Sequence, residues 1–160
     1  MWKASIKYRL PVAHVQAVPR SARDALEAVV FGSVAVTSRA LAVVGLELTL
    51  AQWRVLVVVG ENLEGDATVT EIAARLGAEI SPVSRLVSRL ARRGLVIAYK
   101  DDRDRRVTRV TVSDAGREIR DTVIERRREL LAEVLAAAGP IDRDAEAALH
   151  RIGVAFRRYT

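Results

Sequence analysis

Residues 81–93, SPVSRLVSRLARR, combine hydroxyl and guanidinium side chains at helical spacing. If this segment is a helix, its apolar residues share one face and anchor it to a core; they are Val83, Leu86, Val87 and Leu90. The opposite face carries short hydroxyls and arginines, namely Ser81, Ser84, Arg85, Ser88, Arg89 and Arg92. Short side chains allow close approach to a major groove, and an arginine can donate two parallel hydrogen bonds to a guanine edge. The pattern predicts a DNA-reading helix, in which we expect Arg85 and Arg89 to read bases.

A second basic element follows directly in the sequence. From Leu95 apolar and polar residues alternate, and the segments 95–100 and 106–112 flank the polar run DDRDRR, which predicts a β-hairpin. Its tip carries Arg103, Arg105 and Arg106. Arginines on a narrow projecting ribbon are suited to a minor groove, where negative potential is concentrated. A solvated surface helix would explain the first segment alone, but two neighbouring basic elements favour double-stranded DNA as the partner.

Two side chains of this region have alternative interpretations. Ser81 is expected to cap the helix and, with the free backbone N–H groups there, to hold a phosphate. Asp104 would repel phosphate unless it were paired, so we expect it to orient a neighbouring arginine of the hairpin. A purely turn-forming role for Asp104 is the equal alternative.

The distribution of charge agrees with a polyanionic partner. The chain has a net charge of +6, and residues 81–106 hold eight basic and three acidic residues. Residues 1–20 hold four basic residues and no acidic one, so the rest of the chain is mildly acidic. Clustered cations release phosphate counterions when they bind DNA.

The elements that position these residues form a helix-turn-helix. Thr70 is expected to cap a short helix that ends at Gly77, and Ser81 caps the next, with Pro82 at its first helical position. Gly94 ends this second helix. Two short helices joined by a brief turn that contains glycine are typical of a helix-turn-helix, and the hairpin adds a wing.

Longer helices flank this unit. We expect one from about residue 22 to residue 45 with Ser21 as its cap, and another that Thr49 caps and Gly60 ends. Residues 61–69 suit a loop and a very short strand. A long helix follows Ser113 or Asp114, and a last one follows Asp142 after the break at Gly139 and Pro140. The predicted fold is mainly α with a small β-hairpin.

Composition excludes several classes of function. The chain has no cysteine, and its two histidines, His14 and His150, lie far apart in the sequence, so we expect no metal and no cofactor. No nucleophilic triad or glycine-rich phosphate loop indicates an enzyme. The apolar stretch 29–46 is expected to be too short and too polar to span a membrane, and residues 1–20 lack the apolar core of a secretory signal. A cytoplasmic location without membrane contact is the expectation.

The residues also carry a resemblance. Asp104, Arg105 and Arg106, followed by Val112-Ser113 and Gly116, are similar to an Asp-x-Arg, Leu-Thr and Gly pattern in the wing of the multiple-antibiotic-resistance regulator (MarR) family of transcription factors. Residues 83–96, VSRLVSRLARRGLV, resemble the recognition helix and turn of that family. The resemblance covers residues 22–158.

The resemblance implies a homodimer whose terminal helices interlock and whose two winged domains read a pseudo-palindromic operator. The apolar surface of the terminal helices supports this, since a winged domain alone could not bury it. The domains would be a basic arm (1–20), an N-terminal dimerisation helix (21–48), a winged helix-turn-helix (49–113) and C-terminal dimerisation helices (114–160).

Members of the family are commonly repressors that respond to a small phenolic or lipophilic effector. In this chain the candidate lining of an effector pocket is Phe31, Val34, Trp53 and Val57, with plain core packing as the alternative for each. Two other functions stay open. One is an architectural protein that tolerates any DNA sequence, and the other is a winged-helix module that binds proteins. The hydroxyl-rich face of residues 81–93 favours sequence reading over the first, and the second would not need three arginines on the wing tip.

Overall fold

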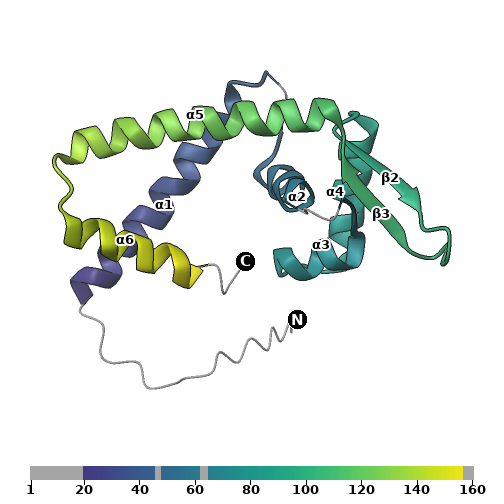
Figure 1. Ribbon diagram of the computed structural model, residues 1–160, viewed down its shortest axis with the longest axis horizontal. Helices are drawn as coiled ribbons and strands as arrows, with labels where there is room; N and C mark the ends of the chain where they lie inside the picture. Colours follow the sequence, from purple (N-terminus) through teal and green to yellow (C-terminus); the bar gives the residue numbers. More distant parts are fainter. Residues whose placement is uncertain (1–19, 46–47, 62–64, 157–160) are drawn as a thin grey trace, which may run out of the picture. The chain divides into compact units, whose positions relative to one another are not determined.

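The computed structural model describes residues 20–45, 48–61 and 65–156, and Figure 1 shows the order of the elements. The expected N-terminal arm therefore lies, except for Arg20, outside the described residues. In chain order the elements are α1 (Arg20–Ala42), α2 (Leu50–Gly60), β1 (Ala67–Thr68), α3 (Val69–Leu76), α4 (Ile80–Arg92), β2 (Val96–Lys100), β3 (Thr108–Val112), α5 (Asp114–Ala138) and α6 (Arg143–Phe156). This mainly helical fold with a small antiparallel sheet confirms the predicted class.

The described residues fall into two compact units, which divide between Val34 and Ala35. The described part of the first unit is the beginning of α1, which exposes Val29, Val30, Phe31 and Val34. Ser21 lies inside this helix rather than capping it, and the helix ends at Ala42, earlier than the expected Gly45. Gly45 follows the helix in the left-handed backbone region, with φ +61°.

The length of α1 corrects one expectation about membranes. The helix that holds the apolar stretch begins at Arg20 and has 23 residues, with an 18-residue window of mean hydropathy 1.4. It is therefore long and apolar enough to cross a membrane, and the prediction that the stretch is too short was wrong. A single such helix is weak evidence for a span, because core helices and signal sequences have the same length and composition.

Capping boxes define the starts of α2 and α3. Thr49 accepts a hydrogen bond from the backbone N–H of Gln52, whose side chain in turn accepts the Thr49 N–H, as the Thr49 prediction required. In α3 the cap is Thr68 and not Thr70, because Thr68 and Glu71 form the same reciprocal pair. The T-x-x-E spacing of a capping box is present in the sequence at residues 68–71.

The start of α4 also differs from the expectation. Its first helical residue is Ile80, and Glu79 precedes it with an extended backbone and no side-chain cap. Ser81 is the second helical residue, and its hydroxyl accepts a hydrogen bond from Arg85 Nη1 at 2.9 Å instead of capping the helix. Pro82 is the third, where a backbone N–H would still have no partner within the helix.

Three antiparallel strands form one sheet in the order β1-β3-β2. The hairpin register pairs Val96 with Val112 and Lys100 with Thr108, so residues 101–107 form the wing tip. The hairpin is followed by α5, which Ser113 caps by accepting the backbone N–H of Gly116. A Cβ at Gly116 would lie 2.0 Å from the carbonyl oxygen of Leu95, so only glycine allows α5 to lie this close to the chain before β2.

The core lies between α2, α3, α4, β3 and the first half of α5. Its largest fully buried side chains are Leu56, Ile72, Leu90, Val55, Val59, Val83, Val110 and Val123. The anchoring face of α4 is part of it, since Val83, Val87 and Leu90 are buried and Leu86 is partly buried. This packing fixes which face of α4 points to solvent.

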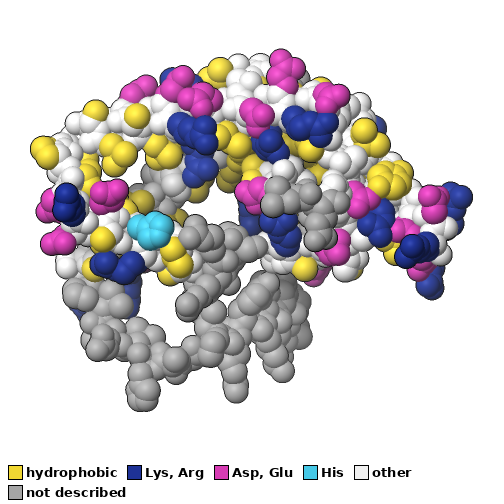
Figure 2. Space-filling model, in the orientation of Figure 1, with side chains coloured by type: hydrophobic (Ala, Val, Ile, Leu, Met, Phe, Trp, Pro, Cys, Tyr) yellow, Lys and Arg dark blue, Asp and Glu magenta, His cyan; other side chains and the backbone are white. Residues whose placement is uncertain are grey.

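The end of α5 and the helix α6 expose apolar side chains. Gly139 ends α5 with φ +85°, and Asp142 accepts the backbone N–H of Ala145 at the start of α6, as predicted. No residue of α6 is buried. Figure 2 shows hydrophobic side chains along α5 and α6. The exposed ones on these helices and in the segment between them are Leu131, Val134, Leu135, Ile141, Leu149, Ile152, Val154 and Phe156. These helices therefore present an apolar surface that the described residues of one chain do not cover.

Candidate nucleic-acid interface

The solvent-facing side of α4 carries the predicted reading residues. Ser81, Ser84, Arg85, Ser88 and Arg89 are all exposed. Arg85 is bonded to Ser81 within the helix, and Ser88 Oγ donates to the carbonyl oxygen of Ser84 at 2.9 Å. The Arg89 side chain has no hydrogen bond or ion pair with any described residue, so its donors are available to a ligand.

The wing tip carries the second predicted group, visible as dark blue side chains at the right of Figure 2. Arg103 and Arg105 are exposed. Arg106 forms a two-point contact with Asp104, with Nε 3.0 Å from Oδ1 and Nη2 2.9 Å from Oδ2, while its side chain stays 91% exposed.

Asp104 combines the two interpretations that the sequence left open. It pairs with the Arg106 side chain, and its Oδ1 also accepts the backbone N–H of Arg106 at 3.0 Å, as a turn-forming aspartate does. The hydrogen bonds from Arg106 hold the pKa of the Asp104 carboxyl below its usual value. The expected contact is present, and a role in orienting Arg106 toward DNA stays a prediction.

A groove joins the helix face to the wing. It has a volume of about 720 Å³, and its polar lining consists of Thr68, Thr70, Ser84, Lys100, Asp104, Arg106 and Thr108. Ser84 comes from α4 and Arg106 from the wing tip, so both predicted groups border the same depression. Hydroxyls and cations side by side are the groups that proteins use to contact a phosphate backbone.

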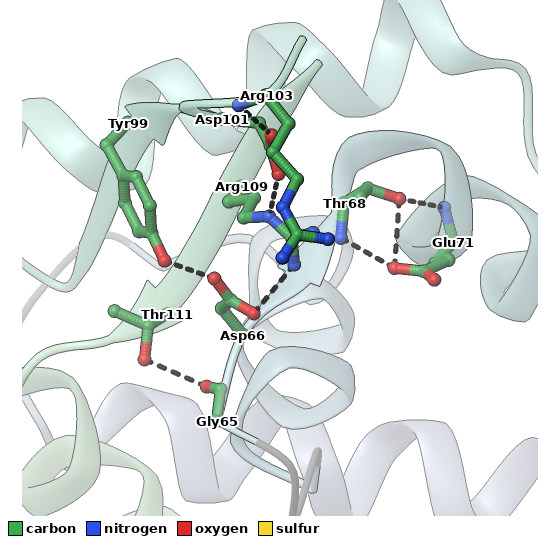
Figure 3. Close-up of polar contacts among 9 residues, drawn as sticks. All are labelled: Gly65, Asp66, Thr68, Glu71, Tyr99, Asp101, Arg103, Arg109 and Thr111. Carbon is green, nitrogen blue, oxygen red and sulfur yellow. Dashed lines mark hydrogen bonds and ion pairs between the residues drawn. The ribbon is translucent and has the colours of Figure 1, made fainter.

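Sequence reasoning missed a network at the base of the wing, which Figure 3 shows. Arg109 on β3 donates from Nη1 to Asp66 Oδ1 at 3.0 Å and from Nε to Asp101. Tyr99 on β2 donates its hydroxyl to Asp66. The network connects the chain before β1, both strands of the hairpin and the first residue of the wing tip.

The network changes the acidity of its members. Hydrogen bonds from Arg109 and from two backbone N–H groups lower the pKa of Asp101 to about 2. The Tyr99 hydroxyl and then Arg109 lower the pKa of Asp66, and the same hydrogen bond raises the pKa of Tyr99. The available sequence signal was the strand pairing, since Tyr99 and Arg109 are cross-strand partners. Asp66 could not be found this way, because it belongs to neither hairpin strand.

A second cavity of about 680 Å³ lies between α2, α3 and α5. Its apolar lining is Trp53, Val57, Val58, Leu76 and Ile124, and its charged lining is Arg54, Arg75, Arg127 and Glu61. The predicted pocket residues Trp53 and Val57 therefore lie together here. Phe31 and Val34 belong to the other compact unit, so their place in an effector pocket stays a prediction.

The charged lining is the feature that hydrophobicity did not predict. Arg75 donates to the carbonyl oxygen of Val58 and to Glu61, and Arg54 donates to the carbonyl oxygen of Leu76. The Nε of Arg127 is buried and has no hydrogen-bond partner in the described part of the chain. Within that part, no group of three or more histidine or acidic residues could hold a metal ion.

Comparison with known proteins finds a family match for the winged part of the chain. A model described as "MarR family" matches residues 46–107, which run from the residues before α2 to the wing tip. The chain is 32% identical over 85 residues to the HTH-type transcriptional repressor IacR of Pseudomonas putida. Residues 46–107 therefore match the MarR family. The match to IacR spans 53% of this chain and 50% of IacR, so it covers about half the length of that relative.

Solved structures share the fold along most of the chain. Rv1404 of Mycobacterium tuberculosis is 25% identical with a TM-score of 0.70, and the alignment covers 87% of this chain and 96% of that one. A transcriptional regulator of the MarR family from Rhodococcus sp. RHA1 is 22% identical with a TM-score of 0.68, covering 91% and 99%. These neighbours show the winged-helix fold. The MarR family and its named members here are regulators of transcription, not enzymes.

Proposed function

We propose that this protein is a cytoplasmic transcriptional regulator of the MarR family that binds double-stranded DNA in a sequence-specific manner and acts as a repressor. The observation that carries the proposal is the shared groove, which Ser84 of α4 and Arg106 of the wing tip both line. A helix in the major groove and a wing in the neighbouring minor groove would place both basic groups on one duplex.

Relatives supply further support for DNA binding. MarR of Escherichia coli and FabT of Streptococcus pneumoniae, which share the fold at 19% and 14% identity, have been solved with DNA. IacR is named a repressor. In this chain the candidate reading residues are Ser81, Ser84, Arg85, Ser88 and Arg89 on α4, with Arg103, Arg105 and Arg106 on the wing.

The proposed active form is a homodimer on a pseudo-palindromic operator. Its support is the apolar surface of α5 and α6, which the described residues of one chain leave exposed. A two-fold symmetric dimer buries the same patch on both subunits and sets two recognition helices at the spacing of successive major grooves. Symmetry of the protein would then be matched by symmetry of the operator.

The test is selection of bound duplexes from a random pool at physiological salt, followed by titration of the selected duplex against a scrambled one. We expect a pseudo-palindrome that binds at least a thousandfold more tightly, which is the lower end for specific regulators, roughly 10³ to 10⁷. Tight binding without preference would indicate an architectural protein instead. No binding to any duplex would favour the protein-interaction module.

A ligand response is the second part of the proposal, and the buried Arg127 Nε favours it. We infer that the cavity beside Trp53 takes a small aromatic molecule with an acidic group, because an unpartnered guanidinium N–H is costly until it finds an acceptor. PcaV of Streptomyces coelicolor, 26% identical with a TM-score of 0.53 over 66% of this chain, was solved with its natural ligand.

Benzoate and its neutral analogue benzamide test this part. We expect benzoate to raise the melting temperature of the protein and benzamide to have little effect, since only the carboxylate forms an ion pair with a guanidinium. Arg127→Gln removes the lining cation whose buried Nε lacks a partner among the described residues and should reduce the difference between the two probes. An equal response to both, in both proteins, would show that the cavity does not select anions.

A further inference from the structure

We propose that Asp101, Arg109 and Asp66 are positioning residues that set the wing tip for DNA before the DNA arrives. This inference rests on the proposed DNA-binding function. It concerns residues that contact neither the groove nor the face of α4, and whose charges are mostly satisfied inside the protein. Their effect on DNA is transmitted through the backbone of the tip.

The first link is Arg109, which joins two acids from different parts of the chain. Its Nη1 bonds to Asp66, just before β1, and its Nε bonds to Asp101, just after β2. Because the guanidinium is planar, donors that point in different directions fix both acids relative to β3. Tyr99 on β2 donates to the other oxygen of Asp66. Both strands of the hairpin are therefore bonded to the chain segment just before β1.

The second link is Asp101, whose side chain is only 12% exposed. Its Oδ1 accepts the backbone N–H of Arg103 at 2.8 Å and of Asp104 at 3.1 Å, while its Oδ2 takes the Arg109 bond. The backbone N–H of Asp101 also donates to the carbonyl oxygen of Val107 at 3.1 Å, which closes the tip. One carboxylate therefore fixes the backbone of the tip and connects it to β3.

The third link is Asp104, which connects the ordered backbone of the tip to the exposed side chain of Arg106. Asp104, whose backbone Asp101 holds, pairs with the Arg106 side chain through both oxygens. Arg106 is thus oriented although its side chain is almost fully exposed. A tip ordered in advance loses less conformational freedom on binding, which strengthens binding without any added contact.

The acidic neighbour Asp102 gives this proposal a matched control. It lies beside Asp101 in the tip, it is exposed, and it has no hydrogen bond or ion pair with any described residue. Asp101→Ala and Asp102→Ala remove the same negative charge from almost the same place. Electrostatics alone predicts tighter DNA binding for both variants, because each loses a charge that repels phosphate.

The positioning proposal instead predicts that the two variants differ in their DNA affinity. With the duplex selected above, we expect Asp102→Ala to leave the Kd equal or lower it, and Asp101→Ala to raise it about tenfold. Asp66→Ala, outside the tip, should also raise the Kd, and Arg109→Lys should bind better than Arg109→Ala because it keeps one ion pair. Changes in the base pairs beneath the wing should matter less in Asp101→Ala, whereas changes beneath α4 keep their effect.

Hydrogen exchange without DNA separates this inference from the proposed function. We expect faster exchange of the Arg103 and Asp104 amides in Arg109→Ala, with the amides of the core unchanged. Protected tip amides in that variant, or tighter DNA binding by Asp101→Ala, would overturn the positioning role. If the wild-type protein binds no duplex while the amides behave as expected, the proposed function fails and the tip order stands without a DNA role.

Discussion

Arg85 and Arg89 occupy the same face of α4 but differ before any DNA is bound. Arg85 is held by Ser81, whereas Arg89 has no partner among the described residues. A bidentate contact to a base discriminates by about 1 to 3 kcal/mol, so we expect Arg89→Ala to lose about that much affinity for the operator and to relax its preference at one position. Arg85→Ala should lose specificity by a smaller amount, because reading a base also breaks the Ser81 bond.

Titration of both variants against the selected duplex and its single-base mutants measures the effect. Arg128→Ala on α5 is the control, since it removes an equal charge from an exposed side chain outside the interface. If Arg89→Ala and Arg128→Ala weaken binding equally at every operator variant, only the overall charge matters. The assignment of α4 as the reading helix would then be wrong.

Arg106 makes a different prediction, which concerns salt. A fully free cation that neutralises one phosphate contributes a slope of about 0.9 to the dependence of log K on log salt. Since Asp104 already pairs with Arg106, we expect Arg106→Ala to lower the slope by less than this amount and to weaken all duplexes alike. Binding curves at several salt concentrations give the slope, and an unchanged slope would place Arg106 away from the phosphates.

The carboxyl of Asp101 reports on the wing-base network directly. Its pKa of about 2 lies below the ordinary 3.8, so the bonds it makes stabilise the protein above pH 3.8 and are lost as the pH falls toward 2. We expect the wing to be insensitive to pH between 5 and 8. An NMR titration of the Asp101 side-chain carbon should give a midpoint near 2 in the wild type and a higher one in Arg109→Ala. A wild-type midpoint near 3.8 would show that the network is absent in solution.

At the scale of the element, mutation can test whether Thr68 or the neighbouring Thr70 caps α3. Thr68 accepts the backbone N–H of Glu71 at 3.1 Å, and Glu71 Oε2 accepts the Thr68 N–H at 2.7 Å. Replacing an N-cap threonine by alanine costs about 0.5 to 2 kcal/mol, so we expect Thr68→Ala to lose about that much unfolding free energy. Thr70→Ala should stay within about 0.5 kcal/mol, as exposed positions do. Urea unfolding of both variants compares them, and equal losses would contradict the assignment of the cap.

These elements show what could be predicted from the sequence. The hydrophobic period of α4 and the alternation of the hairpin predicted the hairpin and the solvent-facing side of α4 correctly, because both patterns depend on local burial. The cap of α3 was misplaced although its T-x-x-E pattern is local and readable. The Arg109 network could not be predicted, since it depends on Asp66 reaching the hairpin across 43 residues of chain.

The cavity beside Trp53 could also be predicted only in part from the sequence. Apolarity predicted Trp53 and Val57, which do line it, but the three arginines around them are positioned by the packing of α2, α3 and α5. Arg75 and Arg54 reach backbone carbonyls of other helices, at Val58 and Leu76. Such contacts depend on how helices cross, and periodicity within one helix carries no information about them.

At the scale of the whole molecule, the exposed apolar surface of α5 and α6 predicts the oligomeric state. Fully burying a leucine or isoleucine side chain stabilises a protein by about 1.5 to 3 kcal/mol, and a two-fold interface counts each residue twice. Leu149 and Ile152 lie three residues apart on α6 and are 48% and 38% exposed in one chain. Their combined burial in a dimer would be a substantial part of the interface energy.

We therefore expect the wild-type protein to have twice the chain mass of 17.6 kDa by light scattering, and Leu149→Asp/Ile152→Asp to be a monomer. Neither side chain belongs to the buried core, so the circular dichroism of the winged domain should be largely retained. Arg151→Asp is the control on the same helix and should stay dimeric. The monomer should bind a single half-site as the wild type does but lose the gain from the second half-site. A monomeric wild type with full affinity for the palindrome would contradict the dimer, because one recognition helix cannot reach both half-sites.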